Sequence, residues 1–230
     1  MPDEPLAFSP DQFSGLARVF PLPNLVMFPH VMQALHIFEP RYLEMFEEAI
    51  EDDRLIALGL LAPGWEQHAD ERPPLHPTAC LCRIATYQRT PQGSYNVLLL
   101  GVRSLRLGRE LPATKLFRVV ESEILEDYEP ETAPSGAAGH MQRQLLTAFK
   151  AAMPKIPQAY EQLDQLLGSQ ISLGMLTDIV SYTIELDIDT KLQLLAECDV
   201  FRRTRLLMDA IRARGAGGMS RPFPPDFSLN

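Results

Sequence analysis

Three prolines between residues 19 and 29 constrain the fold of this chain more than any other feature of its sequence. The run VFPLPNLVMFP places Pro21, Pro23 and Pro29 inside a strongly apolar segment. Each proline lacks an amide donor and fixes φ, so the run predicts neither a helix nor a central strand. The same run is too apolar for a solvated loop. It therefore predicts an edge strand followed by a bulged turn, both packed onto a core.

A strand and a helix are predicted directly after this run. The segment Val31–Phe38 has the apolar character of a strand, and Pro40 is a favourable first residue for a helix. Apolar residues then recur at helical spacing, which predicts a helix at Arg41–Asp52. These apolar residues are Tyr42, Met45, Phe46, Ala49 and Ile50.

The pattern changes from strand to helix near residue 126. Strand signals continue to that point and include a hairpin turn at Pro91-Gln92-Gly93. Later segments have helical spacing, with Ser172, Asp189 and Asp199 as expected N-caps. We therefore predict five parts. They are a flexible arm (1–16), a β-rich part (17–126), a Pro/Gly-rich linker (127–139), a helical part (140–214) and a disordered tail (215–230).

Composition and charge are those of an ordinary globular protein. The 230 residues are 46% hydrophobic and 22% charged, with a formal net charge of −9. An acidic protein does not attract nucleic acid or anionic lipid, so neither is an expected partner. The apolar runs are too short to span a membrane, and the first residues, Met-Pro-Asp-Glu-Pro, are unlike a secretory signal. The sequence predicts a cytoplasmic location.

The three cysteines predict neither a disulfide framework nor a metal site. Cys80 and Cys82 lie two residues apart within a predicted strand, after His68 and His76. Structural zinc sites place two to four residues between their cysteines on a turn, because both sulfurs must reach one ion. We expect Cys80 and Cys82 to be small buried side chains, and we predict no metal.

The order of these elements resembles the amino-terminal domain of the ATP-dependent Lon proteases, which also occurs in cereblon-like proteins. The resemblance covers about residues 17–213. The matching segments are Phe20-Pro21-Leu22, Asn24, Val26-Met27-Phe28-Pro29, Leu35–Phe38, Arg41, Leu55–Leu61, Cys80–Tyr87, 93–103, Leu176-Thr177-Asp178, Leu186-Asp187 and 191–197. The resemblance implies an α+β fold, in which a small, partly closed, PUA-like β-barrel with one helix precedes a helical bundle.

Residues that carry the catalysis of Lon proteases are missing from this sequence. A P-loop needs a lysine after a glycine, yet none of Lys115, Lys150, Lys155 and Lys191 follows a glycine. Ser135 faintly echoes the serine motif of the Lon peptidase but lies in the predicted linker, so we interpret it as a linker residue. We predict no ATPase activity, no peptidase activity and no cofactor.

The predicted function is non-enzymatic binding of unfolded or partly folded polypeptides, either to present them to a protease or as an adaptor. Capture would add a strand to a sheet edge or seat side chains in an apolar groove. Candidate binding residues are Met27, Phe28, Pro29, Phe38, Tyr42 and Trp65. Two alternatives stay open at this point: an RNA-binding PUA-like module, and a hydrolase in the loop from Trp65 to His76.

Overall fold

The structure is a computed structural model that describes residues 8–68, 72–152 and 171–216. Residues 1–7 of the predicted arm, residues 217–230 of the predicted tail and the helix expected at 157–167 therefore lie outside the described residues. The boundaries of the five predicted parts stay a prediction.

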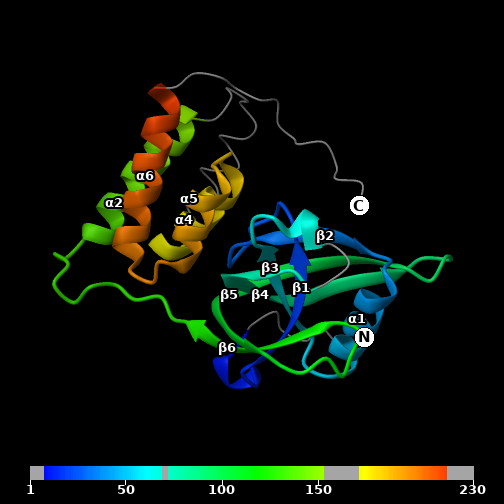
Figure 1. Ribbon diagram of the computed structural model, residues 1–230. Coiled ribbons are helices and arrows are strands. Elements are labelled where there is room, and N and C mark those ends of the chain that lie inside the picture. Colours follow the sequence, from blue (N-terminus) through cyan, green and yellow to red (C-terminus); the bar gives the residue numbers. More distant parts are fainter. Residues whose placement is uncertain (1–7, 69–71, 153–170, 217–230) are drawn as a thin grey trace.

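The strands form one mixed sheet that closes into a ring (Figure 1). Along the sheet the order is β2-β5-β4-β3-β1-β6, and β6 also pairs with β5. The ring therefore runs from β5 through β4, β3, β1 and β6 back to β5, with β2 attached outside it. Because the strands make a ring and not a true barrel, the predicted PUA-like barrel is not confirmed. The strands are β1 (Leu16–Leu22), β2 (Met32–Ile37), β3 (Leu55–Leu61), β4 (Leu75–Arg89), β5 (Tyr95–Glu110) and β6 (Arg118–Leu125).

Strand β1 corrects the expectation drawn from the prolines. Pro21 lies within β1, and β1 has a neighbour on each side, so it is not an edge strand. The two neighbours, however, meet different halves of it. Strand β6 pairs antiparallel with Leu16–Val19, whereas β3 pairs parallel with Val19–Leu22. At Pro21 only the β3 side is paired, through Gly59, so β1 behaves locally as an edge strand, where a residue without an amide donor is tolerated.

The predicted bulged turn is present where β2 begins. His30 N–H donates to the Gly101 carbonyl at 2.8 Å, and Gly101 N–H donates to the Val31 carbonyl at 2.9 Å. Two residues of one segment thus oppose a single residue of β5, which is the pattern of a β-bulge. His30 has a φ of 64°, a left-handed conformation that usually belongs to glycine at this position of a bulge.

Helix α1 (Pro40–Glu51) begins at Pro40, as expected. Its buried residues include Met45 and Phe46, which share a core with β-strand residues such as Leu99. Cys80 and Cys82 belong to this core and are fully buried, which confirms their predicted packing role. A second apolar cluster, built from residues such as Leu81 and Leu105, contains different side chains of the same strands.

The helices that follow the sheet are α2 (Ala137–Ala152), α4 (Leu173–Thr183), α5 (Ile188–Ala196) and α6 (Val200–Ala216). Ser172 caps α4 by accepting from Met175 N–H at 3.1 Å, and Asp199 caps α6 by accepting from Phe201 N–H at 2.9 Å, as predicted. The prediction for α5 is wrong by two residues: Asp187 caps the helix, accepting from Thr190 N–H at 2.8 Å, and the predicted cap, Asp189, lies in the first turn.

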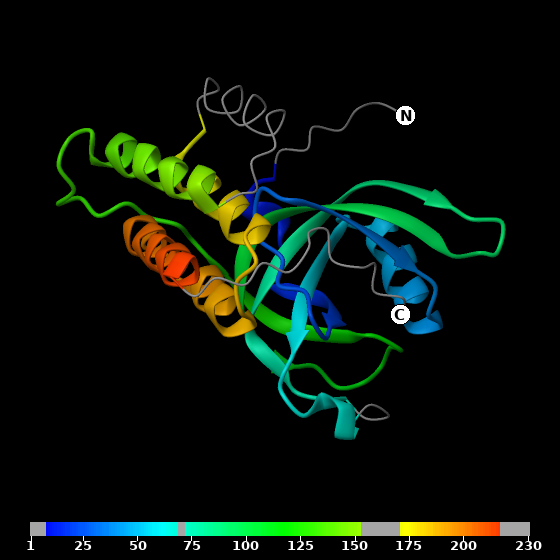
Figure 2. The ribbon, with the colours of Figure 1, turned by 90° about the horizontal axis from the view of Figure 1, so that it is seen from above.

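These helices share a core with the strands. Figures 1 and 2 show the helices together on one side of the strand ring. Phe28 and Leu60, from the strand-rich part, lie in one buried cluster with Val180 of α4 and Leu195 of α5. A helical bundle that packs apart from the sheet is therefore not confirmed. Two short 3₁₀ helices complete the described elements, η1 (Pro10–Gln12) and η2 (Trp65–His68).

The first testable prediction concerns Gly101. A Cβ atom at this position would lie 2.1 Å from the Phe28 carbonyl oxygen and 2.9 Å from its carbonyl carbon, both of them backbone atoms that cannot rotate away. We expect Gly101→Ala to lower the free energy of unfolding by about 1–3 kcal/mol or more, as overpacked sites do. Urea unfolding followed by circular dichroism measures the change.

Gly139→Ala provides the matched control for Gly101→Ala. Gly139 lies in α2, where an added Cβ would meet Arg143 Nη1 at an ordinary 3.6 Å. Alanine also favours helix more than glycine does, by up to about 1 kcal/mol. This variant should be as stable as the native protein or more so. Equal stability of the Gly101→Ala and Gly139→Ala variants would contradict the account of the bulge.

Candidate functional site

The outer edge of β2 is the first candidate site. Strand β2 pairs antiparallel with β5 from Met32, opposite Leu100, to Ile37, opposite Tyr95. Within the described parts of the chain, no strand pairs with its other edge. We call this edge, from Met32 to Ile37 with Phe38 at its end, the β2 edge. An unpaired edge presents backbone donors and acceptors that another extended segment can use.

Several side chains of the β2 edge are both apolar and exposed. Met32 is 48% exposed and Phe38 is 44% exposed, and Ala34 is exposed between them. The ring of His36 stacks on Phe38 at 5.7 Å, and its Nδ1 lies 2.8 Å from Asn96 Oδ1 on β5. Proteins commonly protect an edge with lysine, other charged residues or proline, but the strand Met-Gln-Ala-Leu-His-Ile contains none of these.

Next to the β2 edge is a margin of partly buried apolar side chains, which consists of Leu35, Leu43 and Tyr182. Leu35 of β2, Leu43 of α1 and Tyr182 of α4 each pack against the main core without being fully covered. The hydroxyl of Tyr182 donates to Gln33 Oε1, which attaches α4 to the first half of β2. Apolar contact area therefore lies close to the unpaired backbone.

The six residues predicted from the sequence lie in different surroundings. Met27, Phe28 and Pro29 are buried in the turn between β1 and β2, and Tyr42 is buried in α1 beneath Phe20. Trp65 is half-buried in η2. Phe38 is exposed at the end of β2. Contact with a polypeptide stays a prediction for all six, and Phe38 is the one that adjoins the β2 edge. The sequence reasoning missed Met32, which no pattern distinguishes from an interior strand residue.

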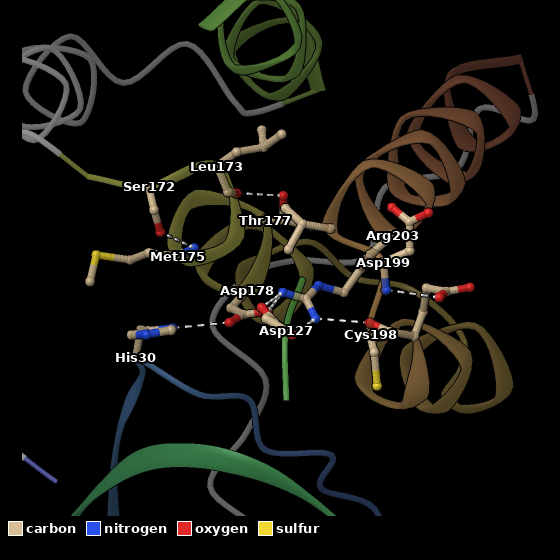
Figure 3. A network of polar contacts seen from close by, with 12 residues as sticks. His30, Asp127, Ser172, Leu173, Met175, Thr177, Asp178, Cys198, Asp199 and Arg203 are labelled. Carbon is tan, nitrogen blue, oxygen red and sulfur yellow. Dashed lines mark hydrogen bonds and ion pairs between the residues drawn. The ribbon is translucent and has the colours of Figure 1, made fainter. Parts of the chain in front are cut away.

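A second feature, which we call the polar junction, consists of His30, Asp127, Asp178 and Arg203 (Figure 3). His30 precedes β2, Asp127 follows β6, Asp178 lies on α4 and Arg203 lies on α6. His30 Nδ1 is 3.0 Å from Asp178 Oδ2, and Arg203 Nη2 is 3.4 Å from Asp178 Oδ1. Arg203 Nη1 donates to Asp127 Oδ1 at 2.6 Å. Four distant segments of the chain thus meet around one carboxylate.

The geometry of the polar junction is supported by its neighbours. Gly174 lies beside it, and an added Cβ there would approach Asp127 Oδ2 to 3.1 Å and Arg203 Nη2 to 3.4 Å. Arg203 Nη1 also donates to the Glu197 carbonyl at 2.9 Å. The absence of a side chain at Gly174 lets α4 and the ion pair come close together.

Burial shifts the pKa values of two groups in the polar junction, Asp178 and Arg203. The side chains of Asp178 and Arg203 are only 2% and 3% exposed. Burial raises the pKa of Asp178, although the hydrogen bond with His30 and the charge of Arg203 oppose the rise. Burial also works against the charge of Arg203, but Asp127 and Asp178 raise the pKa of its guanidinium overall. Asp178 Oδ1 and Arg203 Nε have no hydrogen-bond partner, so the junction is incompletely satisfied.

The sequence did not reveal the polar junction. His30 and Asp178 are 148 residues apart, and Asp127 and Arg203 are 76 residues apart. No local spacing connects such residues. Asp127 even falls in the segment interpreted as a linker. The one available signal was an arginine at a core-facing position of a predicted helix.

The described residues contain neither a metal-binding cluster nor a membrane-spanning helix. No group of three or more histidine, cysteine, aspartate or glutamate side chains among them could hold a metal ion. None of the helices described is both long enough and apolar enough to cross a membrane.

The second testable prediction compares two arginines of α6. We expect Arg203→Ala to lower the free energy of unfolding by about 3–5 kcal/mol, because it leaves a buried carboxylate without its ion pair. Arg212→Ala removes a pair with Asp209 in which both side chains are about two-thirds exposed or more, 66% and 72%. That change should cost about 0–1 kcal/mol. Thermal and urea unfolding at pH 7 measure both. Similar losses in the two variants would show that the polar junction does not support the fold.

Comparisons with known proteins identify relatives of this chain. The model of the ATP-dependent protease La (LON) substrate-binding domain matches residues 17–213. The Lon protease of Anaeromyxobacter dehalogenans is 20% identical over 219 residues, which are 91% of this chain and 24% of that protein. The Lon protease of Heliobacterium modesticaldum is 25% identical over 201 residues, 84% of this chain and 23% of that protein. The chain spans about a quarter of the length of these curated relatives.

Solved structures share the fold. The Lon N-terminal domain protein from Xanthomonas campestris is similar with a TM-score of 0.60 and 21% identity, over 84% of this chain and 97% of that chain. The N-terminal domain of the Mycobacterium avium complex Lon protease is similar with a TM-score of 0.63 and 17% identity, over 86% of this chain and 98% of that chain. Together with the family match over residues 17–213, these similarities show that the chain belongs to the family of LON substrate-binding domains.

Proposed function

We propose that this domain binds polypeptides without catalysing a reaction, and that the β2 edge receives an extended apolar segment. The observation that carries the proposal is that β2 is unpaired on one side, is apolar and has no charged residue to block pairing. Such an edge either binds another strand or promotes aggregation. Membership of a substrate-binding domain family favours the first outcome.

Binding would follow the mechanism of strand addition. The backbone of the incoming segment pairs with the outer donors and acceptors of β2, which supplies affinity with little dependence on sequence. Its side chains alternate between the two faces of the extended sheet. One row then lies near Met32 and Ala34, and the other lies near the margin of Leu35, Leu43 and Tyr182. Phe38 adds apolar area at the end of the strand.

A role in proteolysis follows from the relatives. Several related proteins are named Lon protease, and this chain aligns with about a quarter of their length. We propose that the domain recognises unfolded segments, either to present them to a protease or as an adaptor in protein quality control. A cytoplasmic location is part of the same proposal.

Surface charge favours polypeptide over RNA. The arginines of β5 are the natural candidates for a basic stripe, but each faces a glutamate. Arg106 lies 3.4 Å from Glu123 and Arg109 lies 2.5 Å from Glu121, while Arg103 lies 4.0 Å from Glu126. Paired charges leave little excess positive potential for phosphate groups.

The third testable prediction concerns Met32. We expect the native chain to bind a fluorescent, extended peptide of alternating apolar and polar residues with micromolar affinity, roughly −8 kcal/mol. Met32→Lys should weaken binding at least about tenfold, because a charged side chain on an edge opposes pairing. The fold should be unaffected, since Met32 is 48% exposed. Fluorescence anisotropy measures affinity, and circular dichroism checks the fold.

Two comparisons give this experiment its controls. Leu206→Lys changes an apolar residue of comparable exposure, 42%, on α6 and should leave binding unchanged. Two peptides test the mechanism, one N-methylated at the odd-numbered amides and the other at the even-numbered amides. In an added strand, alternate amides face β2, so one of the two peptides must lose the donors that pair with it. Full binding by both methylated peptides would exclude strand addition. Tight, salt-sensitive binding of RNA without binding of the peptide would overturn the proposed function.

A further inference from the structure

The polar junction is short of one positive charge. Arg203 carries the single fixed positive charge among the four side chains, whereas Asp127 and Asp178 together carry two negative charges when ionised. The sum is −1 while His30 is neutral, and it becomes zero when the pair of His30 and Asp178 holds one additional proton. Asp178 and Arg203 are almost fully buried, so an unbalanced charge there is costly.

The same junction is attached to the start of β2 through the backbone. His30 holds its left-handed conformation between two constraints: the bulge hydrogen bonds with Gly101 and the side-chain contact with Asp178. Release of the side chain would remove the constraint that α4 places on this turn. The position of α4 and the geometry of the bulge are thus connected by one pair of side chains.

From these contacts we infer that His30 and Asp178 form a proton-linked latch, which holds α4 on the bulge when the pair carries a proton and loosens when the proton leaves. The inference concerns the fold itself and holds whether or not the β2 edge binds polypeptide. It does not require the whole domain to unfold, because the contact joins α4 to one turn.

The charged and titratable groups around Asp178 determine how the latch should respond to pH. It is faced by His30 from the turn before β2, Arg203 from α6, Asp127 from the segment after β6 and Cys80 from β4. Burial raises the pKa of Cys80 well above its usual value, so this thiol stays neutral. The remaining groups are those of the charge sum, and no second cation among them compensates Asp178.

The sign of the pH dependence follows from linkage. Burial raises the pKa of Asp178 in the closed junction, whereas a solvated carboxyl in the open state has its ordinary value. The closed state therefore binds the proton more strongly than the open state does. Closure is favoured below the ordinary carboxyl range and is progressively lost as pH rises through the raised value.

The fourth testable prediction uses amide hydrogen exchange of the native chain, followed by NMR from about pH 4, near the ordinary carboxyl value, to about pH 8. The reporters are the amides of His30 and Gly101, which donate across the bulge. After correction for the intrinsic rate, we expect their protection to fall at least about threefold over this range. The amide of Thr90, which donates to the Ser94 carbonyl in the β4–β5 hairpin, should keep its protection and serves as the internal reference.

Variants separate the latch from general effects of pH. Asp178→Asn removes the titrating carboxylate, and His30→Asn removes the imidazole while keeping a residue that tolerates the left-handed conformation. Each should abolish most of the pH dependence at Gly101. His36→Asn removes a histidine that contacts an asparagine amide and no carboxylate, so it should leave that dependence intact. Constant protection in the native chain from about pH 4 to about pH 8, or an unchanged dependence in His30→Asn, would overturn the inference.

Discussion

The close approach of two backbone segments, the turn before β2 and the middle of β5, is the constraint on which the rest of this structure depends. The Phe28 carbonyl sits so near Gly101 that no side chain fits between them. Adjacent residues of that turn then pack in different directions: Met27 belongs to the core shared with α1, and Phe28 belongs to the core shared with the helices. One turn therefore connects the two principal cores, and an error in its position would disturb both.

Local signals in the sequence predicted the elements well because those signals act over a few residues. Pro40 begins α1, Ser172 and Asp199 cap their helices, and the turn at Pro91-Gln92-Gly93 joins β4 to β5. The error at Asp189 is of the same kind, because Asp187 is an equally good cap two residues earlier. Strand Val31–Phe38 was expected, and the structure places it at Met32–Ile37.

Properties that depend on distant residues were beyond local reasoning. The proline in β1 was taken to exclude a central strand, because the sequence does not show that β6 leaves β1 at Val19 and that pairing on that side ends there. The closure of β6 onto β5, the exposure of Met32 and the meeting of His30 with Asp178 are likewise consequences of topology. For the candidate site, local reasoning therefore predicted the strand itself and named Phe38 at its end, but it did not predict that one edge of this strand is unpaired or which surfaces lie beside it.

One edge of strand β5 is shared between two partner strands. Its first residues pair with β2 and its later residues pair with β6, while β4 runs along the opposite edge. The ring is complete without β2, so β2 is an appendage to a closed frame. If the β2 edge binds polypeptide as proposed, substitutions along its outer side would change what the domain recognises, whereas the closed frame would keep its shape. Recognition in such a protein can diversify between relatives, or be redesigned, independently of the parts that fold it.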